Sequence, residues 1–78
     1  MKKTQTINLG GIIFHIEVGA YDQLHTYLAS VKNQFADTDG LDEIIEDIEA
    51  RIAEILNEKK VKIITGKHVD DVIVIMGK

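Results

Sequence analysis

Two successive glycines, Gly10 and Gly11, join two short runs in which polar and apolar residues alternate. Residues 4–9 read TQTINL, and residues 12–17 read IIFHIE. Alternation with a period of two is typical of strands that are buried on one face. A Gly-Gly connection favours a type I′ turn, because both central residues of that turn need positive φ. The sequence therefore predicts a β-hairpin.

The two-residue loop also fixes the register of this hairpin. It places Leu9 opposite Ile12 and Ile7 opposite Phe14. The opposite face is mostly polar, apart from Ile13. Since only one face is apolar, the hairpin is expected to cover a core on one side. The residues of the apolar face are Ile7, Leu9, Ile12, Phe14 and Ile16.

The pattern changes to a helical period after the hairpin. In residues 20–35 the apolar and aromatic side chains fall within an arc of roughly 120° at about 100° per residue. Residues 36–40, ADTDG, break that pattern. Residues 41–58 then show a second stripe, of isoleucines and leucines, opposite a row of acidic side chains. Two amphipathic helices joined by a short loop should pack antiparallel, with their stripes facing each other.

The last part of the chain combines strand and helix signals. Residues 61–65, VKIIT, are short and rich in β-branched side chains, so they are predicted to form a third strand. Residues 66–76 are ambiguous, because VIVIM favours a strand whereas the apolar residues recur at helical spacing. Thr65 as an N-cap and Gly77 as a C-terminal stop favour the helix.

These elements predict one small α+β domain over residues 1–78, with the order β-β-α-α-β-α. Its sheet is expected to have three strands, mostly antiparallel, with the helices packed on one face. A chain of 78 residues, 45% of them hydrophobic, suffices for one such core. The expected core includes Ile7, Leu9, Phe14, Leu24, Leu28, Val31, Phe35, Ile45, Ile48, Ile52 and Ile63.

Composition and charge exclude several classes of function. The chain has no Cys, so it has no disulfide framework and no thiolate site. Its net charge of −4 and its pI near 5.2 argue against a nucleic-acid-binding domain, which needs a basic face. No segment approaches the ~18 apolar residues of a membrane span. We therefore expect the chain as given to be soluble.

The sequence carries no recognisable catalytic or ligand-binding motif. Residues 35–46 resemble a calcium loop only weakly, because Phe35 stands where the first ligand is required. The histidines His15, His25 and His68 lack the spacing of a metal site. The acidic side chains of the second helix should stay solvated on its outer face. We therefore expect no enzyme activity, no cofactor, no metal and no small-molecule substrate.

Lys59, Lys60 and Lys62 form a small basic cluster. Lysines are favourable at a helix C-terminus, which accounts for the cluster as the end of the second helix. Contact with anionic lipid is the alternative, and each lysine near a charged membrane surface contributes about 1 kcal/mol to such contact.

Four stretches of the chain together resemble a known family. They are MKKTQTINLGGIIFHIE, YDQLHTYLASVKNQF, DEIIEDIEARIAEIL and HVDDVIVIMGK. They resemble the N-terminal cytoplasmic region of bacterial proteins that carry a phage shock protein C (PspC) domain further along the chain. The resemblance implies a helix for the C-terminal residues. It also implies that this chain is the N-terminal part of a longer protein of envelope-stress signalling, attached to the inner membrane.

We therefore expect a non-enzymatic protein-interaction or regulatory module, with the membrane reached only through segments beyond Lys78. A homo-oligomerisation domain with a mainly structural role is an alternative, and a small-ligand or metal sensor is a third. The expected interaction surface combines apolar residues that do not fit the inward faces with acids of the second helix. These residues are Ile13, Ile64, Val74, Asp42, Glu46 and Glu49.

Overall fold

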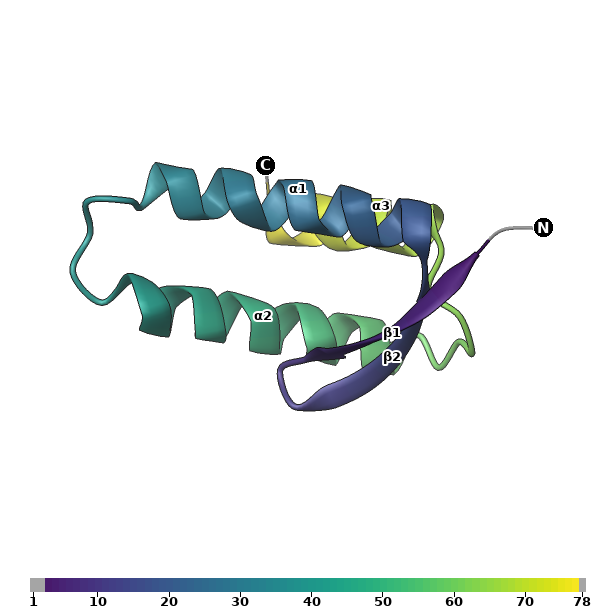
Figure 1. Cartoon of the computed structure of the whole chain (residues 1–78). Helices are drawn as coiled ribbons and strands as arrows, with labels where there is room; N and C mark the ends of the chain where they lie inside the picture. Colours follow the sequence, from purple (N-terminus) through teal and green to yellow (C-terminus); the bar gives the residue numbers. More distant parts are fainter. Residues whose placement is uncertain (1–2, 78) are drawn as a thin grey trace.

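The computed structural model describes residues 3–77, which form two strands and three helices (Figure 1). The molecule is elongated, with extents of 41 × 21 × 19 Å. The α1–α2 connection lies at one end and the loop between α2 and α3 at the other. The elements are β1 (Thr4–Leu9), β2 (Ile12–Glu17), α1 (Val18–Gln34), α2 (Leu41–Glu58) and α3 (Gly66–Met76).

The hairpin forms with the predicted register, Leu9 opposite Ile12 and Ile7 opposite Phe14. Gly10 has φ 58° and the following glycine φ 85°, the left-handed values that a type I′ turn requires. The expected connection between the two alternating runs is therefore confirmed.

Gly10 is also the point where the hairpin tip meets α2. A Cβ atom at this position would lie 3.0 Å from both the Cα of Ala50 and the Cβ of Ala53. Small residues on both sides therefore allow the turn to approach the helix closely. This contact helps to hold β1 against α2.

The predicted third strand is wrong, because the sheet has two strands, β1 and β2. Residues 61–65 make a single parallel bridge, between Ile64 and Ile16. The Ile64 N–H donates to the His15 carbonyl at 2.8 Å, and the Glu17 N–H donates to the Ile64 carbonyl at 2.9 Å. Because α3 begins at Gly66, the segment has no length left for a ladder. The observed order is β-β-α-α-α.

The bridge also reverses which side chains of residues 61–65 point into the core, compared with the prediction. Ile64 is 2% exposed, whereas Val61 is 39% and Ile63 is 44% exposed. A residue bridged to Ile16 points to the same face as Ile16, and Ile16 is fully buried. The predicted core position of Ile63 and the predicted outward position of Ile64 are therefore both wrong.

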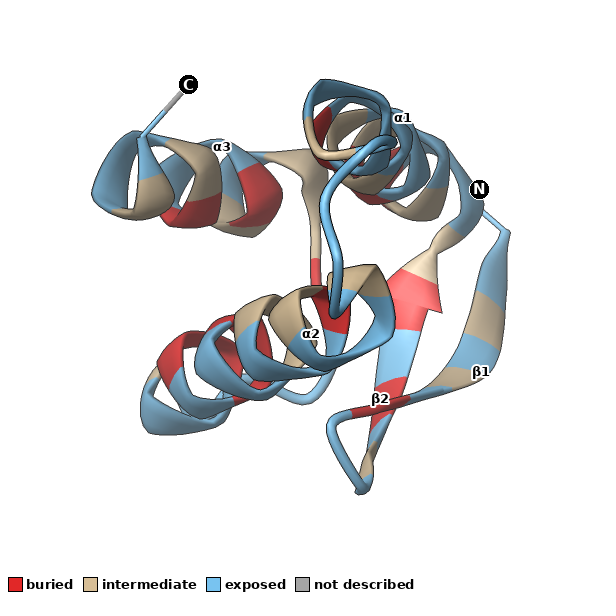
Figure 2. Ribbon diagram, turned by 90° about the vertical axis from the view of Figure 1, so that its left-hand side faces the viewer, coloured by how far each residue is buried: buried red, intermediate tan, exposed pale blue. Residues whose placement is uncertain are grey.

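The core lies between the hairpin and the three helices (Figure 2). Both α1 and α2 pack against α3, while β2 packs on α1 and β1 on α2. The expected direct packing of α1 on α2 is therefore not the main contact of either helix. The central buried residues are Leu9, Phe14, Ile16, Ala20, Leu24, Ile52, Ala53, Ile55, Leu56, Ile64, Val69 and Val72.

Ten of the eleven predicted core residues are buried or partly buried, and the exception is Ile63. Six of them are buried, as expected: Leu9, Phe14, Leu24, Val31, Ile45 and Ile52. Four others are only partly buried. These four are Ile7, Leu28, Phe35 and Ile48.

The helix predicted for residues 66–76 is confirmed, and α3 has a distinctive N-terminal cap. The backbone N–H of Thr65, the N-cap residue, donates to Nδ1 of His68 at 2.9 Å. His68 therefore takes the place of the Glu or Gln that usually closes a capping box. The helix buries Val69 and Val72 completely, and Gly77 follows it with φ 88°.

Candidate functional site

The structure places the predicted apolar surface residues on separate elements. Ile13 is 59% exposed on the outer face of β2, and Val74 is 73% exposed on α3. Ile64 is 2% exposed, so it adds almost no exposed area beside Ile13, although both residues line one depression. The exposed neighbour of Ile13 is instead Val61, which lines the same shallow depression.

The acidic residues of the expected surface lie on two sides of α2. Asp42 and Glu46 are exposed to solvent. Glu49 is half-buried and lines a groove between α2, α1 and the hairpin. Of the three expected acidic residues, Glu49 is therefore the one that lines this groove.

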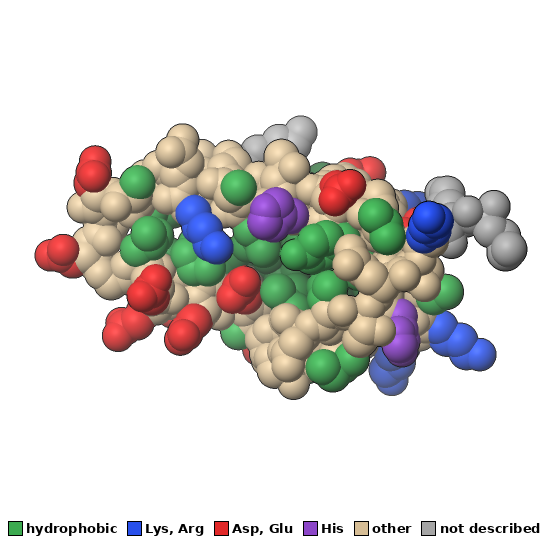
Figure 3. All heavy atoms as spheres, in the orientation of Figure 1, with side chains coloured by type: hydrophobic (Ala, Val, Ile, Leu, Met, Phe, Trp, Pro, Cys, Tyr) green, Lys and Arg blue, Asp and Glu red, His purple; other side chains and the backbone are tan. Residues whose placement is uncertain are grey.

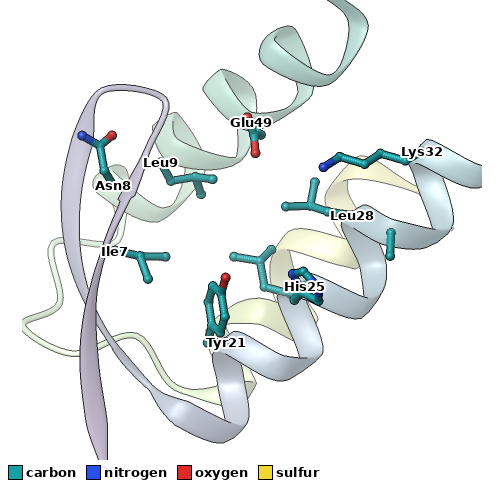
Figure 4. Close-up of a pocket in the computed structure, with 10 residues that line it drawn as sticks. Ile7, Asn8, Leu9, Tyr21, His25, Leu28, Lys32 and Glu49 are labelled. Atoms are coloured by element: carbon teal, nitrogen blue, oxygen red, sulfur yellow. The ribbon is translucent and has the colours of Figure 1, made fainter. Parts of the chain in front are cut away.

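This groove has a volume of ≈ 660 Å³ and opens on the face drawn in Figure 3. It exists because α1 and α2 both lean on α3 and leave a gap on the hairpin side. Figure 4 shows Ile7 of β1 and Tyr21 and Leu28 of α1 pointing into it. Lys32 and Glu49 point from opposite helices toward its mouth. The groove is thus apolar inside with one charge of each sign at its rim.

The free edge of β1 borders this groove. Two of the outward backbone groups of β2 are taken by Ile64, whose N–H donates to the carbonyl of His15 and whose carbonyl accepts from the N–H of Glu17. In an antiparallel ladder, residues whose groups point away from the partner strand face each other. Thr6 opposes His15 and Thr4 opposes Glu17. The backbone groups of Thr4, Thr6 and, by the same alternation, Asn8 therefore point to the open side of β1.

That edge is exposed and has none of the usual protection. Thr4, Thr6 and Asn8 are all exposed. Within residues 3–77 no other segment forms backbone hydrogen bonds to it. Natural sheets usually block an open edge with charged residues, proline or a bulge, but the strand sequence TQTINL contains no charge and no proline. It pairs with β2 in unbroken register.

The edge and the groove together define the candidate site. A strand added beside β1 would direct every second side chain to the face of Ile7 and Leu9, because paired residues point the same way. Both of these residues line the groove. The added strand would therefore place alternate side chains over its apolar interior.

The sequence alone did not reveal this site. It predicted β1 and both helix stripes correctly, but it predicted that the two stripes would close on each other. The available signal was the absence of charge in residues 4–9 of a chain that is 28% charged.

The histidines lie apart in the structure. His15 contacts the Thr6 hydroxyl at 3.2 Å, and the ring of His25 lies 5.9 Å from that of Tyr21, while His68 caps α3. Among the described residues, no group of three His, Asp or Glu side chains is placed to hold a metal ion. Residues 35–46, which weakly resemble a calcium loop, run through Gly40, the N-cap of α2, and continue into the first turns of that helix.

Comparisons with known proteins identify no relative. The chain matches no protein-family model, and no curated protein or solved structure shows significant similarity to it. The resemblance to the phage shock family therefore rests on the sequence motifs. Within residues 3–77, none of the helices is long and apolar enough to cross a bilayer.

Proposed function

We propose that this chain is a non-enzymatic interaction module that takes up an extended segment of a protein partner as a new strand beside β1. The observation that carries this proposal is the open, uncharged edge of β1 next to an apolar groove. Strand addition is a common way for small domains to bind peptides, because the exposed backbone groups of an edge strand are ready to pair.

The two parts of the site have different tasks in this proposal. Backbone hydrogen bonds at Thr4, Thr6 and Asn8 supply affinity that does not depend on the partner's sequence. The groove supplies specificity, because alternate side chains of the partner enter it. We expect those side chains to be apolar. Lys32 and Glu49 at the rim favour a partner with an acidic and a basic residue flanking the apolar positions.

The resemblance to proteins with a phage shock protein C domain bears on where in the cell this module would act. It favours the cytoplasmic end of a membrane-attached protein of envelope-stress signalling. There, strand addition would recruit or release a regulatory partner.

Homo-oligomerisation is the second candidate, and the same edge favours it. Antiparallel pairing of two β1 strands around Thr6 would set Thr4 of one copy opposite Asn8 of the other. No like charges would oppose each other in this arrangement. Light scattering over a range of concentrations separates the candidates, because a chain that stays monomeric at high concentration contradicts self-pairing.

A peptide-display selection on the 78-residue chain tests the proposal. We expect selected peptides to alternate apolar and polar residues. Thr6→Pro should abolish their binding, because it removes an outward N–H without breaking the ladder to β2. Thr6→Val is the matched control, since it loses the hydroxyl but keeps the N–H, and it should still bind. Peptides that bind the Thr6→Pro protein normally would overturn the proposal.

A further inference from the structure

A second surface, at the end of the molecule that carries the α2–α3 loop (residues 59–65), has features that strand addition does not use. We propose that residues 60–63 of this loop, together with Ile13, form a contact surface for an anionic lipid membrane. This inference is independent of the proposed function, because it involves a different face and a different kind of partner.

The charges of the molecule are separated along its length. Residues 33–50, which include the α1–α2 connection, contain seven acidic residues and no Lys or Arg. Residues 55–71, which include the α2–α3 loop and the first turns of α3, contain four lysines and three acids, Glu58, Asp70 and Asp71. On the face drawn in Figure 3, most acidic side chains lie toward the left-hand end and most basic ones toward the right-hand end. An anionic surface therefore attracts the loop end while the acidic end points away from it.

Exposed apolar side chains lie among these lysines. Val61 is 39% exposed, Ile63 is 44% exposed and Ile13 is 59% exposed. Ile13 and Val61 line one shallow depression together with Lys60 and Lys62. Apolar side chains that insert below the headgroups, with lysines beside them at headgroup level, are the combination by which proteins bind at a membrane interface.

The backbone conformation of Lys60 is a second observation that draws attention to its side chain. It is the only non-glycine residue with positive φ among residues 3–77, at φ 52°. It follows Lys59, the C-cap of α2, at a position where helices usually place glycine because a Cβ is unfavourable there. A glycine would relieve this backbone strain, whereas the lysine brings a charge that favours the C-terminus of α2 and can also meet an anionic partner.

Lys59 does not take part in the same way. Its Nζ lies 3.1 Å from the Asp71 carboxylate, and this ion pair ties the end of α2 to α3. Neither Lys60 nor Lys62 forms an ion pair with any described residue. Their charges are therefore available to a partner.

A lipid surface fits these observations better than a protein does, because it supplies anionic headgroups and an apolar layer together over a flat area. The acidic end of a second copy would match the lysines. It would not offer the exposed isoleucine and valine side chains an equally apolar layer.

Vesicle co-sedimentation of the 78-residue chain tests the charge component. We expect binding to vesicles of phosphatidylserine in phosphatidylcholine at low salt, loss of binding at high salt, and none to phosphatidylcholine alone. Lys60→Gln with Lys62→Gln should weaken binding about 25-fold, at about fivefold per lysine. Lys32→Gln with Arg51→Gln removes the same net charge elsewhere and should change binding less than twofold.

Lys60→Gly separates membrane contact from stability. It should raise the thermal midpoint of unfolding, because glycine removes the left-handed strain. It should also weaken vesicle binding about fivefold. A structural role for this lysine predicts no loss of vesicle binding.

A tryptophan probe tests the apolar component, because the chain has no native Trp. The fluorescence of Ile63→Trp should shift to the blue with the anionic vesicles. That of Val74→Trp should not shift, because position 74 is exposed on α3, outside the proposed surface. The proposal is overturned if both probes shift equally, if neither shifts, or if the two charge-matched double variants lose binding to the same degree. Salt-sensitive self-association without vesicle binding would also overturn it, in favour of contact between copies.

Discussion

Ile64 lies beside Ile16 in a single parallel bridge, and both side chains are almost fully buried, at 2% and 0% exposure. This bridge covers the outer edge of β2 at His15 and Glu17 and lies where the chain passes from α2 into α3. It leaves β1 as the sheet's open strand. The position of the candidate site therefore depends on a pairing that involves one residue.

The bridge predicts opposite effects for two adjacent isoleucines. Ile64→Ala should lower the free energy of unfolding by about 2–5 kcal/mol, because it leaves a cavity in the core. Ile63→Ala, at a side chain 44% exposed, should change it by less than about 0.5 kcal/mol. Urea denaturation measures both. Equal losses of unfolding free energy, or a larger loss for Ile63→Ala, would show that Ile63 is the buried residue and would contradict the bridge.

The two turn glycines should also differ when each is replaced by alanine. Both have positive φ, so each substitution should cost about 1–2 kcal/mol of unfolding free energy from backbone strain. Gly10→Ala should cost more, because its Cβ would meet Ala50 and Ala53 of α2, whereas nothing lies within 4 Å of a Cβ at Gly11. Thermal unfolding of the two variants compares them directly. If Gly11→Ala is equally or more damaging, the hairpin tip does not dock on α2.

The cap of α3 depends on an acceptor at residue 68. His68→Ala should lower the free energy of unfolding by about 1 kcal/mol, because the Thr65 N–H loses its partner. His68→Gln should keep most of the stability, since glutamine commonly fills this position in capping boxes. Guanidinium unfolding of both variants measures the difference. Similar losses in the two would mean that the ring contributes by packing instead.

Much of the fold could be predicted from residue patterns because those patterns are local. Alternation around Gly10 and Gly11 determined the strands, the turn conformation and the register. Helical spacing predicted the extents of α1 and α2 to within a few residues, whereas α3 was ambiguous from spacing alone and was predicted with the help of its caps and of the family resemblance.

The third strand was predicted wrongly because β-branched residues report burial beside a sheet as much as pairing within one. Ile64 satisfies that preference with one bridge, and α3 starts too soon for more. Which side chains of residues 61–65 point inward is determined by the bridge between Ile64 and Ile16. These two residues are 48 positions apart, so no local sequence pattern contains this information.

The candidate site could not be predicted from the sequence for a related reason. The width of the groove depends on how α1 and α2 each pack on α3, and the stripe of a single helix does not encode its distance from a neighbour. Glu49 was expected on an acidic outer surface, yet it lies at the rim of the groove. Ala50 and Ala53 did carry a readable signal, since small residues on a helix allow close approach of another segment.

Amide hydrogen exchange along β1, measured by NMR, tests strand addition most directly. In the free chain, Thr6 and Asn8 should exchange much faster than Ile7, because their N–H groups point to the open edge. A selected peptide should slow the exchange of Thr6 and Asn8 and leave Ile7 nearly unchanged. Protection of Thr6 and Asn8 in the free monomer, or peptide binding that leaves their exchange fast, would contradict the account.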